Sequence, residues 1–318
     1  MLGLAPSASR GQVKDAFRKL CLVYHPDKCS PDRVHVAEAK FKSIKDAYDT
    51  ILKGVNWAAV GMVTPVRNQG SCGSCAHTRT HPLPHQGSCG SCAHHVATAL
   101  VESTLLISGQ GSAGSVDLSE QSLVSCVNPT NSPYNGYGCG GSWIDNNLNY
   151  VRWLGQVKES AWRYSNSNDV CDGRKADATK LASGQAVSLT NAAVRVSPYN
   201  SADGLKAALL LGPVGINLYA DSAFMSYRGG IYDSPTCPTS TINHAVTLIG
   251  YDYDTVTSQW YWLIKNSWGT NWGENGYGRL AMYGNGYGLC AMYRWSYRTA
   301  DARFSSVAMS SGFSRRML

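Results

Sequence analysis

The amino-acid sequence changes character abruptly near Lys53–Gly54, and this change limits the possible folds more than any other feature. Before it, apolar residues recur at helical spacing and only two of the eleven cysteines occur. After it, nine cysteines and a series of strand-like runs follow. A helix-only pattern and a mixed helix–strand pattern are typical of different classes of fold. The sequence therefore predicts two unlike units that join near residue 54.

The first unit, residues 1–54, has the pattern of two amphipathic helices. One covers Gln12 to Tyr24, with its basic residues largely opposite its apolar face, and two prolines follow it. The second covers about 36–52. We expect the two helices to pack antiparallel as a small α-helical hairpin. The side chains expected between them are those of Phe17, Leu20, Phe41 and Tyr48.

The link between these helices contains the tripeptide His25-Pro26-Asp27. With LGLAPSAS, AFRKLCLVYHPDK and AEAKFKSIKDAYDTIL, it resembles the J-domain of co-chaperones over nearly all of residues 1–54. In that family, the tripeptide and the basic helix before it stimulate the ATPase of a heat-shock chaperone, so the resemblance implies such a chaperone as a partner. The implied docking residues are His25, Pro26, Asp27, Lys14, Arg18 and Lys19. The family's first helix would precede Leu2, which indicates an N-terminally truncated J-domain.

The second unit, residues 55–297, has a mixed pattern. Two helical patterns, at 92–107 and 143–155, come before most of the strands. The expected strands are 187–189, 214–218, 244–251, 260–265 and 276–282. Apolar residues make up 43% of the chain and charged residues only 15%, which excludes a disordered chain. Helices first and strands later predict an α+β fold, with two lobes and a cleft between them.

The chemical signal of this unit is the run QGSCGSC from Gln86 to Cys92, with His244 and Asn266 far downstream. A thiol at the start of a helix lies where the helix dipole favours the thiolate. A histidine beside it can form a thiolate–imidazolium pair, and a side-chain amide can orient that histidine. A glutamine side chain and a backbone N–H can donate to a developing oxyanion. This combination is typical of acyl transfer by cysteine.

The same residues resemble the papain family of cysteine proteases, from Trp57 to about Tyr297. The matching motifs are GMVTPVRNQG, QGSCGSC, LSEQSLVSC, GCGGSWIDNN, RGGIY, NHAVTLIGY, WLIKNSWGTNWGENGYGRL and GLCAMY. The resemblance implies a papain-like two-lobe fold, with a helical left lobe and a β-barrel-like right lobe, and a cysteine endopeptidase without a cofactor. It implies four catalytic residues: Cys92 as the nucleophile, His244 as general base and acid, Asn266 as its orienting residue and Gln86 as the oxyanion donor.

The resemblance also implies the substrate-binding residues. Gly141 and Ser142 take the places of the two glycines that pair with the substrate backbone, and Trp268 would shield the His–Asn hydrogen bond from water. An apolar pocket for the substrate's second residue would be lined by Trp143, Ile144 and Ala245. The floor of this pocket, near Arg294 or Trp295, stays open at this point.

Two departures from the family's pattern lie beside these residues. Ala93-His94-His95 follow the nucleophile, where the family usually has tryptophan, a small residue and an aromatic residue. Ser142 replaces the second of the paired glycines. We expect looser packing near the oxyanion site and a narrower cleft, with every catalytic group retained.

With Cys72 and Cys75 set aside, six of the other seven cysteines of the second unit pair as disulfides in the family's pattern, which leaves Cys92 as a thiol. The implied pairs are Cys89–Cys139, Cys126–Cys171 and Cys237–Cys290. Disulfides require an oxidising compartment at some stage, which favours a lysosome, a vacuole or the extracellular space. No signal peptide is visible in the sequence, so the compartment stays open.

The motif QGSCGSCAH occurs twice, as Gln69–His77 and Gln86–His94, and we interpret this as a duplication of seventeen residues. The second copy leads directly into the helical pattern, so Cys92 is the predicted nucleophile and Cys75 the alternative. The four cysteines of the two copies also have a spacing close to that of a zinc ribbon. Because each pair lies in the same protease motif, the duplication explains this spacing, and we expect no metal.

The net charge of +7 belongs to the two ends of the chain. Residues 1–54 hold ten Lys/Arg against six Asp/Glu, and the basic, serine-rich tail 298–318 holds four against one. The charges between them balance, so we expect no nucleic-acid partner, and no run is apolar enough to predict a membrane span. Peptides or proteins are the expected substrates. The alternative function is a J-domain co-chaperone with an inactive protease-like passenger.

Overall fold

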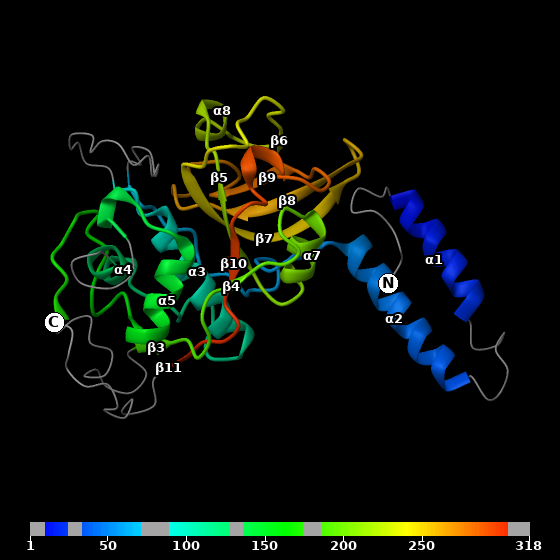
Figure 1. Cartoon of the computed structure of the whole chain (residues 1–318), viewed down its shortest axis with the longest axis horizontal. Helices are drawn as coiled ribbons and strands as arrows, with labels where there is room; N and C mark the ends of the chain where they lie inside the picture. Colours follow the sequence, from blue (N-terminus) through cyan, green and yellow to red (C-terminus); the bar gives the residue numbers. More distant parts are fainter. Residues whose placement is uncertain (1–9, 25–33, 71–88, 128–135, 174–185, 305–318) are drawn as a thin grey trace.

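The structure is a computed structural model that describes residues 10–24, 34–70, 89–127, 136–173 and 186–304. They form a helical hairpin, a helical lobe and a lobe built on a large sheet (Figure 1). The predicted α+β fold with two lobes, preceded by a hairpin, is therefore confirmed. Among the helices of these residues, none is both long enough and apolar enough to cross a membrane.

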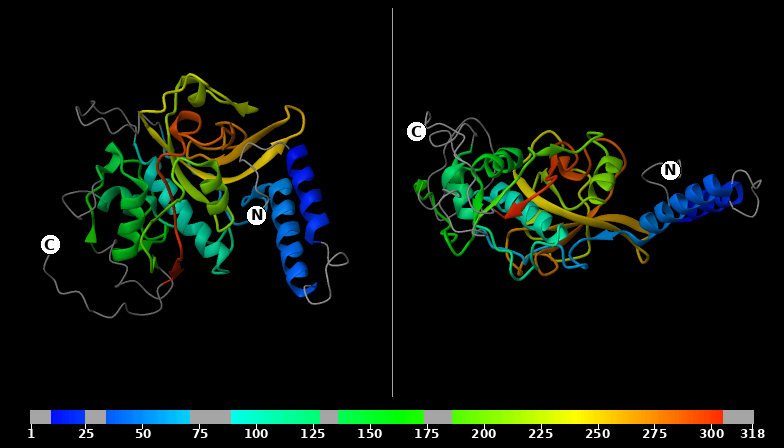
Figure 2. Two further views of the ribbon diagram at one scale, coloured as in Figure 1. Left: turned by 45° about the vertical axis from the view of Figure 1, so that its right-hand side comes forward. Right: turned by 90° about the horizontal axis from the view of Figure 1, so that it is seen from below.

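The hairpin consists of α1 (Arg10–Tyr24) and α2 (Val34–Lys53), which lie side by side (Figures 1 and 2). The short strand β1 (Val55–Asn56) follows directly and pairs with the long strand β7 of the sheet. Among the apolar side chains that the two helices withdraw from solvent are Phe17, Leu20, Phe41 and Ile44. Three of these four were predicted from the helical spacing. The side chain of Tyr48 lies outside the described part of the hairpin.

The helical lobe consists of three helices and a small sheet. The helices are α3 (Cys92–Ile107), α4 (Glu120–Cys126) and α5 (Ile144–Leu154), and a 3-10 turn at Gly138–Gly140 precedes α5. The small sheet has the order β11-β3-β2, with strands β2 (Gln156–Val157), β3 (Ala186–Ser188) and β11 (Arg303–Phe304). Its strand β11 comes from the segment that the sequence assigned to the tail.

The second lobe is built on an eight-stranded sheet of order β4-β10-β5-β7-β8-β9-β6, with β1 added beside β7. Its strands are β4 (Val194–Arg195), β5 (Val214–Leu218), β6 (Ile231–Tyr232), β7 (His244–Asp254), β8 (Gln259–Lys265), β9 (Tyr277–Ala281) and β10 (Ser296–Arg298). The helices α7 (Ala202–Leu209) and α8 (Ser222–Met225) and the 3-10 turn Leu289–Ala291 complete it.

The helix α3 lies where the two lobes meet and packs against both α5 and β7. Fourteen of its sixteen residues are buried, which explains why its sequence is apolar over most of its circumference. Its bounds are those predicted from the helical pattern, 92–107. The position of this helix matters most for the site, because its first residue is the predicted nucleophile.

Three disulfides cross-link the two lobes internally, and they are the three predicted pairs. Cys89–Cys139 and Cys126–Cys171 lie in the helical lobe, and Cys237–Cys290 lies in the other lobe. Among the described residues, the cysteines outside these bridges are Cys21 and Cys92. Each bridge closes a loop of 45 to 53 residues. In the chain-entropy estimate a loop of this length stabilises the fold by about 4 kcal/mol.

Candidate active site

Cys92 is the first residue of α3, and the turn before it is held firmly. The disulfide Cys89–Cys139 anchors this turn, and the N–H of Gly90 donates to the carbonyl oxygen of Cys139 at 2.7 Å. A Cβ on Gly90 would lie 2.8 Å from the same oxygen, so the close approach requires glycine. The Cys92 side chain, 3% exposed, therefore lies at the N-terminal end of the helix, where negative charge is favoured.

His244 and Asn266 meet because antiparallel pairing places the start of β7 beside the end of β8. Thr247 pairs with Lys265, so the residues at the two strand ends are neighbours. The Nε2 atom of His244 lies 2.9 Å from Oδ1 of Asn266, and the N–H of Ser267 donates to the same oxygen at 2.8 Å. Because an amide oxygen only accepts, Nε2 carries the hydrogen, and Nδ1 of the neutral ring carries the lone pair.

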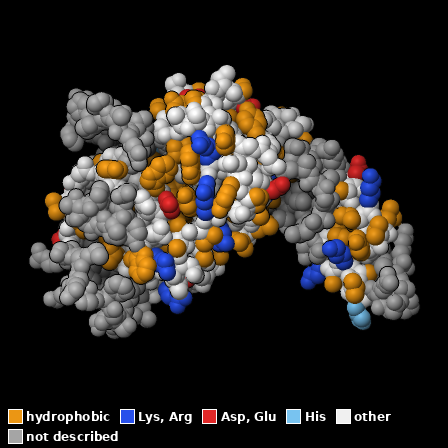
Figure 3. All heavy atoms as spheres, in the orientation of Figure 1, with side chains coloured by type: hydrophobic (Ala, Val, Ile, Leu, Met, Phe, Trp, Pro, Cys, Tyr) orange, Lys and Arg blue, Asp and Glu red, His pale blue; other side chains and the backbone are white. Residues whose placement is uncertain are grey.

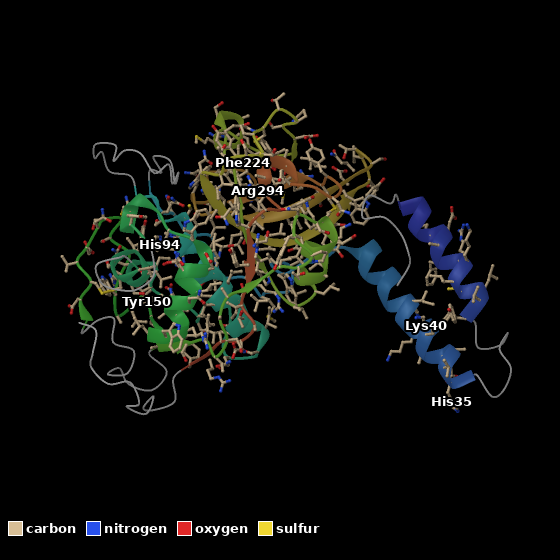
Figure 4. The ribbon with its side chains drawn as sticks, in the orientation of Figure 1. His35, Lys40, His94, Tyr150, Phe224 and Arg294 are labelled. Carbon is tan, nitrogen blue, oxygen red and sulfur yellow. A yellow bond between two sulfur atoms is a disulfide. The ribbon has the colours of Figure 1, made fainter. Side chains whose placement is uncertain are left out.

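Aromatic side chains enclose the histidine–asparagine pair. The ring of Trp268 stacks on that of His244 with a centroid distance of 4.3 Å and an interplanar angle of 24°. Phe224, labelled in Figure 4, lies edge-on to both rings and also contacts Trp272. His244 is 3% exposed and Asn266 2% exposed. The hydrogen bond between them is therefore buried beneath these rings, one of which is Trp268.

Cys92 and His244 line the same pocket between the two lobes. The helical lobe contributes Cys92, Ala93, Ser142 and Trp143 to it, and the other lobe contributes Asn217, Ile242, Asn243, His244 and Ala245. The structure thus brings the predicted nucleophile and base together with three of the predicted substrate-binding residues. Another of them, Gly141, directly precedes Ser142 and has a φ of +106°, in the region that favours glycine.

The position of Ile144 differs from the prediction. Its side chain is fully buried in the hydrophobic core of the helical lobe and does not line the pocket. Ile144 is the first residue of α5, and at this point the helix turns its side chain inward against α3. The residue before it, Trp143, is extended and contributes to the pocket instead.

The predicted oxyanion donor, Gln86, lies outside the described residues, and Gln69 of the first copy lies beside the nucleophile's turn. The Nε2 atom of Gln69 donates to the carbonyl oxygen of Cys89 at 3.2 Å, and its Oε1 accepts from the hydroxyl of Ser267 at 2.5 Å. The backbone N–H of Gln69 also donates to the carbonyl oxygen of Ser267. Gln69 thus bridges the turn before Cys92 and the segment after Asn266.

The site therefore joins the beginning of one copy of the repeated motif to the end of the other. Gln69 comes from the first copy, whereas Cys89 and Cys92 come from the second. The alternative nucleophile Cys75 lies outside the described residues. The signal that could have identified Gln69 was present in the sequence, because the upstream TPVRN run is joined directly to the first copy.

The two histidines that follow Ala93 are buried in α3 and take no part in the pocket. His94 is labelled within the helical lobe in Figure 4, and no described residue donates to or accepts from its ring nitrogens. His95 Nδ1 lies 3.0 Å from the carbonyl oxygen of Ser91, and its ring lies edge-on to Tyr164. Burial lowers the pKa of His94 to about 3 and that of His95 to about 4.

The zinc-like spacing has no counterpart in the described part of the chain, which contains no group of three or more potential metal ligands. Cys89 of this spacing is bonded to Cys139, and Cys92 opens α3. Cys72 and Cys75 lie outside the described residues.

A buried charged cluster lies directly behind the site, and it was not predicted from the sequence. Lys265, the residue before Asn266, donates from Nζ to the carbonyl oxygen of Thr64 at 2.7 Å. Glu102 of α3 accepts from the hydroxyl of Thr64 and from the N–H of Leu118. Burial raises the pKa of Glu102 to about 7 and lowers that of Lys265 to about 8. The cluster connects α3 to β8, the strand that ends at Lys265 directly before Asn266.

The basic residues predicted to dock a chaperone lie on the exposed side of α1. Lys14, Arg18 and Lys19 are exposed, and Arg18 forms a surface ion pair of 3.6 Å with Asp15. Figure 3 shows basic and apolar side chains side by side on the hairpin. His25, Pro26 and Asp27 lie outside the described residues.

Comparisons with known proteins agree with this geometry. The pattern of the papain family cysteine proteases matches residues 76–297, and that of the DnaJ domain matches residues 1–55. Cysteine proteinase 1 of Entamoeba histolytica is 33% identical over 236 residues, which is 73% of this chain and 64% of that protein. Cathepsin L2 of Homo sapiens is 31% identical over 233 residues, or 72% and 60%. The chain thus spans less than two thirds of the length of these relatives.

Solved structures lead to the same family. The bromelain protease from Ananas comosus superposes with a TM-score of 0.62 at 28% identity, covering 78% of this chain and 98% of that one. The Carica candamarcensis cysteine protease CMS1MS2 gives a TM-score of 0.61 at 33% identity with the same coverage. The chain therefore belongs to the papain family of cysteine proteases and has a DnaJ domain at its N-terminal end.

Proposed function

We propose that this chain is a cysteine endopeptidase that hydrolyses peptide bonds through an acyl-enzyme on Cys92. The observation that supports this most strongly is the pocket shared by Cys92 and His244, with the histidine held by Asn266 in the tautomer that accepts a proton on Nδ1. A nucleophile, a base and a group that orients the base are the parts that covalent acyl transfer needs.

The reaction proceeds in two steps. The Cys92 sulfur, its proton transferred to Nδ1 of His244, attacks the peptide carbonyl, and the leaving amine then takes the proton from His244. Water next gives a proton to His244 and attacks the thioester, which releases the acid and restores the thiol. The Asn266 hydrogen bond and the stacked Trp268 keep the imidazole in one orientation through both steps.

The oxyanion donors in this proposal are the backbone N–H of Cys92 and the side chain of Gln69. The first N–H groups of a helix have no acceptor within the helix, so the N–H of Cys92 can donate to the substrate. Gln69 takes the place that the sequence assigned to Gln86, because its side chain is held by Ser267 and Cys89 beside the nucleophile.

The duplicated motif offers a matched test of the nucleophile. We expect Cys92→Ala to abolish turnover of a peptide amide, and Cys75→Ala, which changes the equivalent residue of the first copy, to leave it within about twofold of the original. Far-UV circular dichroism and thermal unfolding would show that both variants fold. Full activity of Cys92→Ala, or loss of activity in Cys75→Ala alone, would contradict the proposal.

A second candidate function rests on the DnaJ match at residues 1–55. We propose that this domain stimulates the ATPase of a heat-shock chaperone through Lys14, Arg18, Lys19 and the tripeptide His25-Pro26-Asp27. A steady-state ATPase assay of such a chaperone with the full chain tests this, with Asp27→Asn as the variant and Glu38→Gln, at an exposed position of α2, as the control on the same domain. Stimulation that persists in Asp27→Asn would contradict it. Stimulation without any peptide hydrolysis would favour the co-chaperone with an inactive protease domain.

A further inference from the structure

The pocket beside Cys92 is small, and one of its walls is a packed tryptophan, Trp143. Its free volume is about 40 Å³, which is room for roughly three water-sized groups. Trp143 lines it, and the ring of Trp295 leans on Trp143 with a centroid distance of 6.1 Å. Trp295 itself is held by Arg294, whose guanidinium lies 4.1 Å from the centre of the indole ring. A large side chain would therefore have to displace a packed tryptophan.

Arg294 is in turn fixed by the backbone. Its Nη1 donates to the carbonyl oxygens of Thr239 and Ser240 at 3.0 and 2.9 Å. The residue is labelled on the sheet lobe in Figure 4. These bonds hold Arg294 against Trp295, so the packing behind Trp143 is fixed by the fold.

The other wall of the pocket contains a polar group. The strand β5 alternates, so that Val214, Ile216 and Leu218 enter the core of the sheet lobe. Asn217 therefore points to the opposite face, towards the helical lobe, where it lines the pocket. Gly215 shares this face, since a Cβ there would meet Val96 and Leu100 of α3.

The amide of Asn217 is oriented by Trp295. Its Nδ2 donates to the carbonyl oxygen of Trp295 at 2.9 Å, and no described residue donates to its Oδ1. The side chain is only 4% exposed, so the pocket is where a ligand can reach it. Asn243, the other asparagine of the pocket, both donates to and accepts from the backbone of Ala220. Asn217 thus supplies the pocket with a hydrogen-bond acceptor.

We propose that this pocket selects a small side chain with a hydroxyl donor, threonine above all, at the second residue before the cleaved bond. The volume admits a side chain with about three heavy atoms, Trp143 with Trp295 packed against it excludes larger ones, and Asn217 Oδ1 accepts the hydroxyl hydrogen. This differs from the apolar pocket that Trp143 and Ala245 suggest in the sequence. The inference rests on the proposed endopeptidase activity and adds its substrate preference.

The test compares peptide amides that differ only at this residue. Threonine and valine have nearly the same shape, so the ratio of their kcat/KM values isolates the contribution of the threonine hydroxyl. We expect threonine to exceed valine by about fivefold to tenfold, the value of one net hydrogen bond. We expect leucine and phenylalanine to be cleaved at least about tenfold more slowly than threonine because they do not fit. The proposal would be overturned if kcat/KM for the valine peptide equalled or exceeded that for the threonine peptide, or if the leucine or phenylalanine peptide had the highest value.

Two variants separate the two parts of the pocket. Asn217→Leu keeps the size and removes the acceptor, so the threonine-to-valine ratio should fall to about one or below. Trp295→Ala removes the ring packed against Trp143 and lets that wall move, so kcat/KM for leucine and phenylalanine peptides should rise relative to threonine. Unchanged ratios in both variants, measured on samples with cooperative thermal unfolding, would overturn the assignment of these residues.

A separate readout distinguishes this inference from the proposed function. Iodoacetamide is small enough to reach a thiol without filling the pocket, and the alkylated residue can be mapped by mass spectrometry. If no peptide of the panel is cleaved, the endopeptidase activity and the preference both fail. A second outcome is that peptides are cleaved and that alkylation of Cys92 abolishes the cleavage, but that the order of kcat/KM among the peptides differs from the expected one. In that case only the preference fails.

Discussion

The two sides of the cleft are built differently. On the sheet lobe, His244 is hydrogen-bonded to Asn266, stacked on Trp268 and bordered by Phe224, so its position is fixed from several directions. On the helical lobe, Cys92 is followed by two buried histidines, and the ring nitrogens of His94 have no described partner. Both sides contain buried polar atoms without a described hydrogen-bond partner, Asn266 Nδ2 and Trp268 Nε1 on the sheet lobe and the two ring nitrogens of His94 on the helical lobe. The two sides therefore differ in how many contacts fix the reactive side chain itself.

This difference indicates where the protein tolerates change. The side that orients the base depends on several contacts of aromatic rings and amides, and the loss of any of them would change the orientation of the His244 imidazole. The side that holds the nucleophile depends mainly on the turn before α3, which the Cys89–Cys139 disulfide and Gln69 hold in place.

Removal of the base should have the largest effect. We expect His244→Ala to lower kcat/KM for a peptide amide by about 10⁴-fold, because the Cys92 thiol then has no proton acceptor and the leaving amine no proton donor. Steady-state kinetics checks this, with thermal unfolding as the control for folding. Activity above about a tenth of the original would contradict the role of His244.

Removal of a disulfide should separate stability from geometry. We expect Cys89→Ala with Cys139→Ala, and equally Cys237→Ala with Cys290→Ala, to lower the free energy of unfolding by about 4 kcal/mol, since both loops have similar lengths. Only the removal of Cys89–Cys139 should also lower kcat, because this bridge holds the turn before Cys92. The effect on kcat should be seen well below the unfolding temperature of the variant. Equal activities of the two double variants, measured at a temperature where both are folded, would show that this bridge does not position the nucleophile.

The oxyanion donor can be tested with the two glutamines of the repeated motif. Gln69→Ala should lower kcat by about 10²-fold to 10³-fold, as the loss of one oxyanion donor does elsewhere. Gln86→Ala should leave kcat within about twofold. The opposite result, with Gln86 as the sensitive residue, would show that the second copy of the motif supplies the donor and that Gln69 is only structural.

The buried histidines should make the protein less stable in acid. Both folded pKa values lie below the value of about 6.5 for an unfolded histidine. Between these values the unfolded chain binds protons that the folded chain does not, so the free energy of unfolding falls as the pH falls from about 7. At pH 6 the loss relative to pH 8 should be about 1 kcal/mol for each ring.

The matched control for this effect is the double variant His94→Ala with His95→Phe, which has the small and aromatic residues typical of the family. Between pH 8 and pH 6, its free energy of unfolding should fall by about 2 kcal/mol less than that of the original protein. Burial raises the pKa of Glu102 and Glu120 to about 7, which acts in the opposite direction, but both proteins contain these residues and the difference isolates the histidines. Identical pH dependence in denaturant titrations would refute this.

Much of the fold and part of the site could be predicted because the relevant patterns are local. The helix 92–107 has one continuous apolar pattern, and the motifs around His244 and Asn266 place both residues at strand ends. Gln69 could not be preferred to Gln86 by spacing alone, because seventeen residues separate the two copies of the motif and only the fold brings Gln69 to the turn before Cys92. Asn217 could not be recognised, since a strand of sequence VGINL shows an apolar pattern and only the fold reveals that one of its faces meets the cleft.

The central claim is that the nucleophile is Cys92, supplied by the second copy of the motif and activated by His244. The most direct measurement is alkylation of the full chain with limiting iodoacetamide, followed by peptide mapping and an activity assay on the same samples. We predict that the label accumulates on Cys92 in proportion to the loss of peptide hydrolysis, and that His244→Ala slows this labelling. Labelling of Cys75 in proportion to the loss of activity, with Cys92 unmodified, would contradict it.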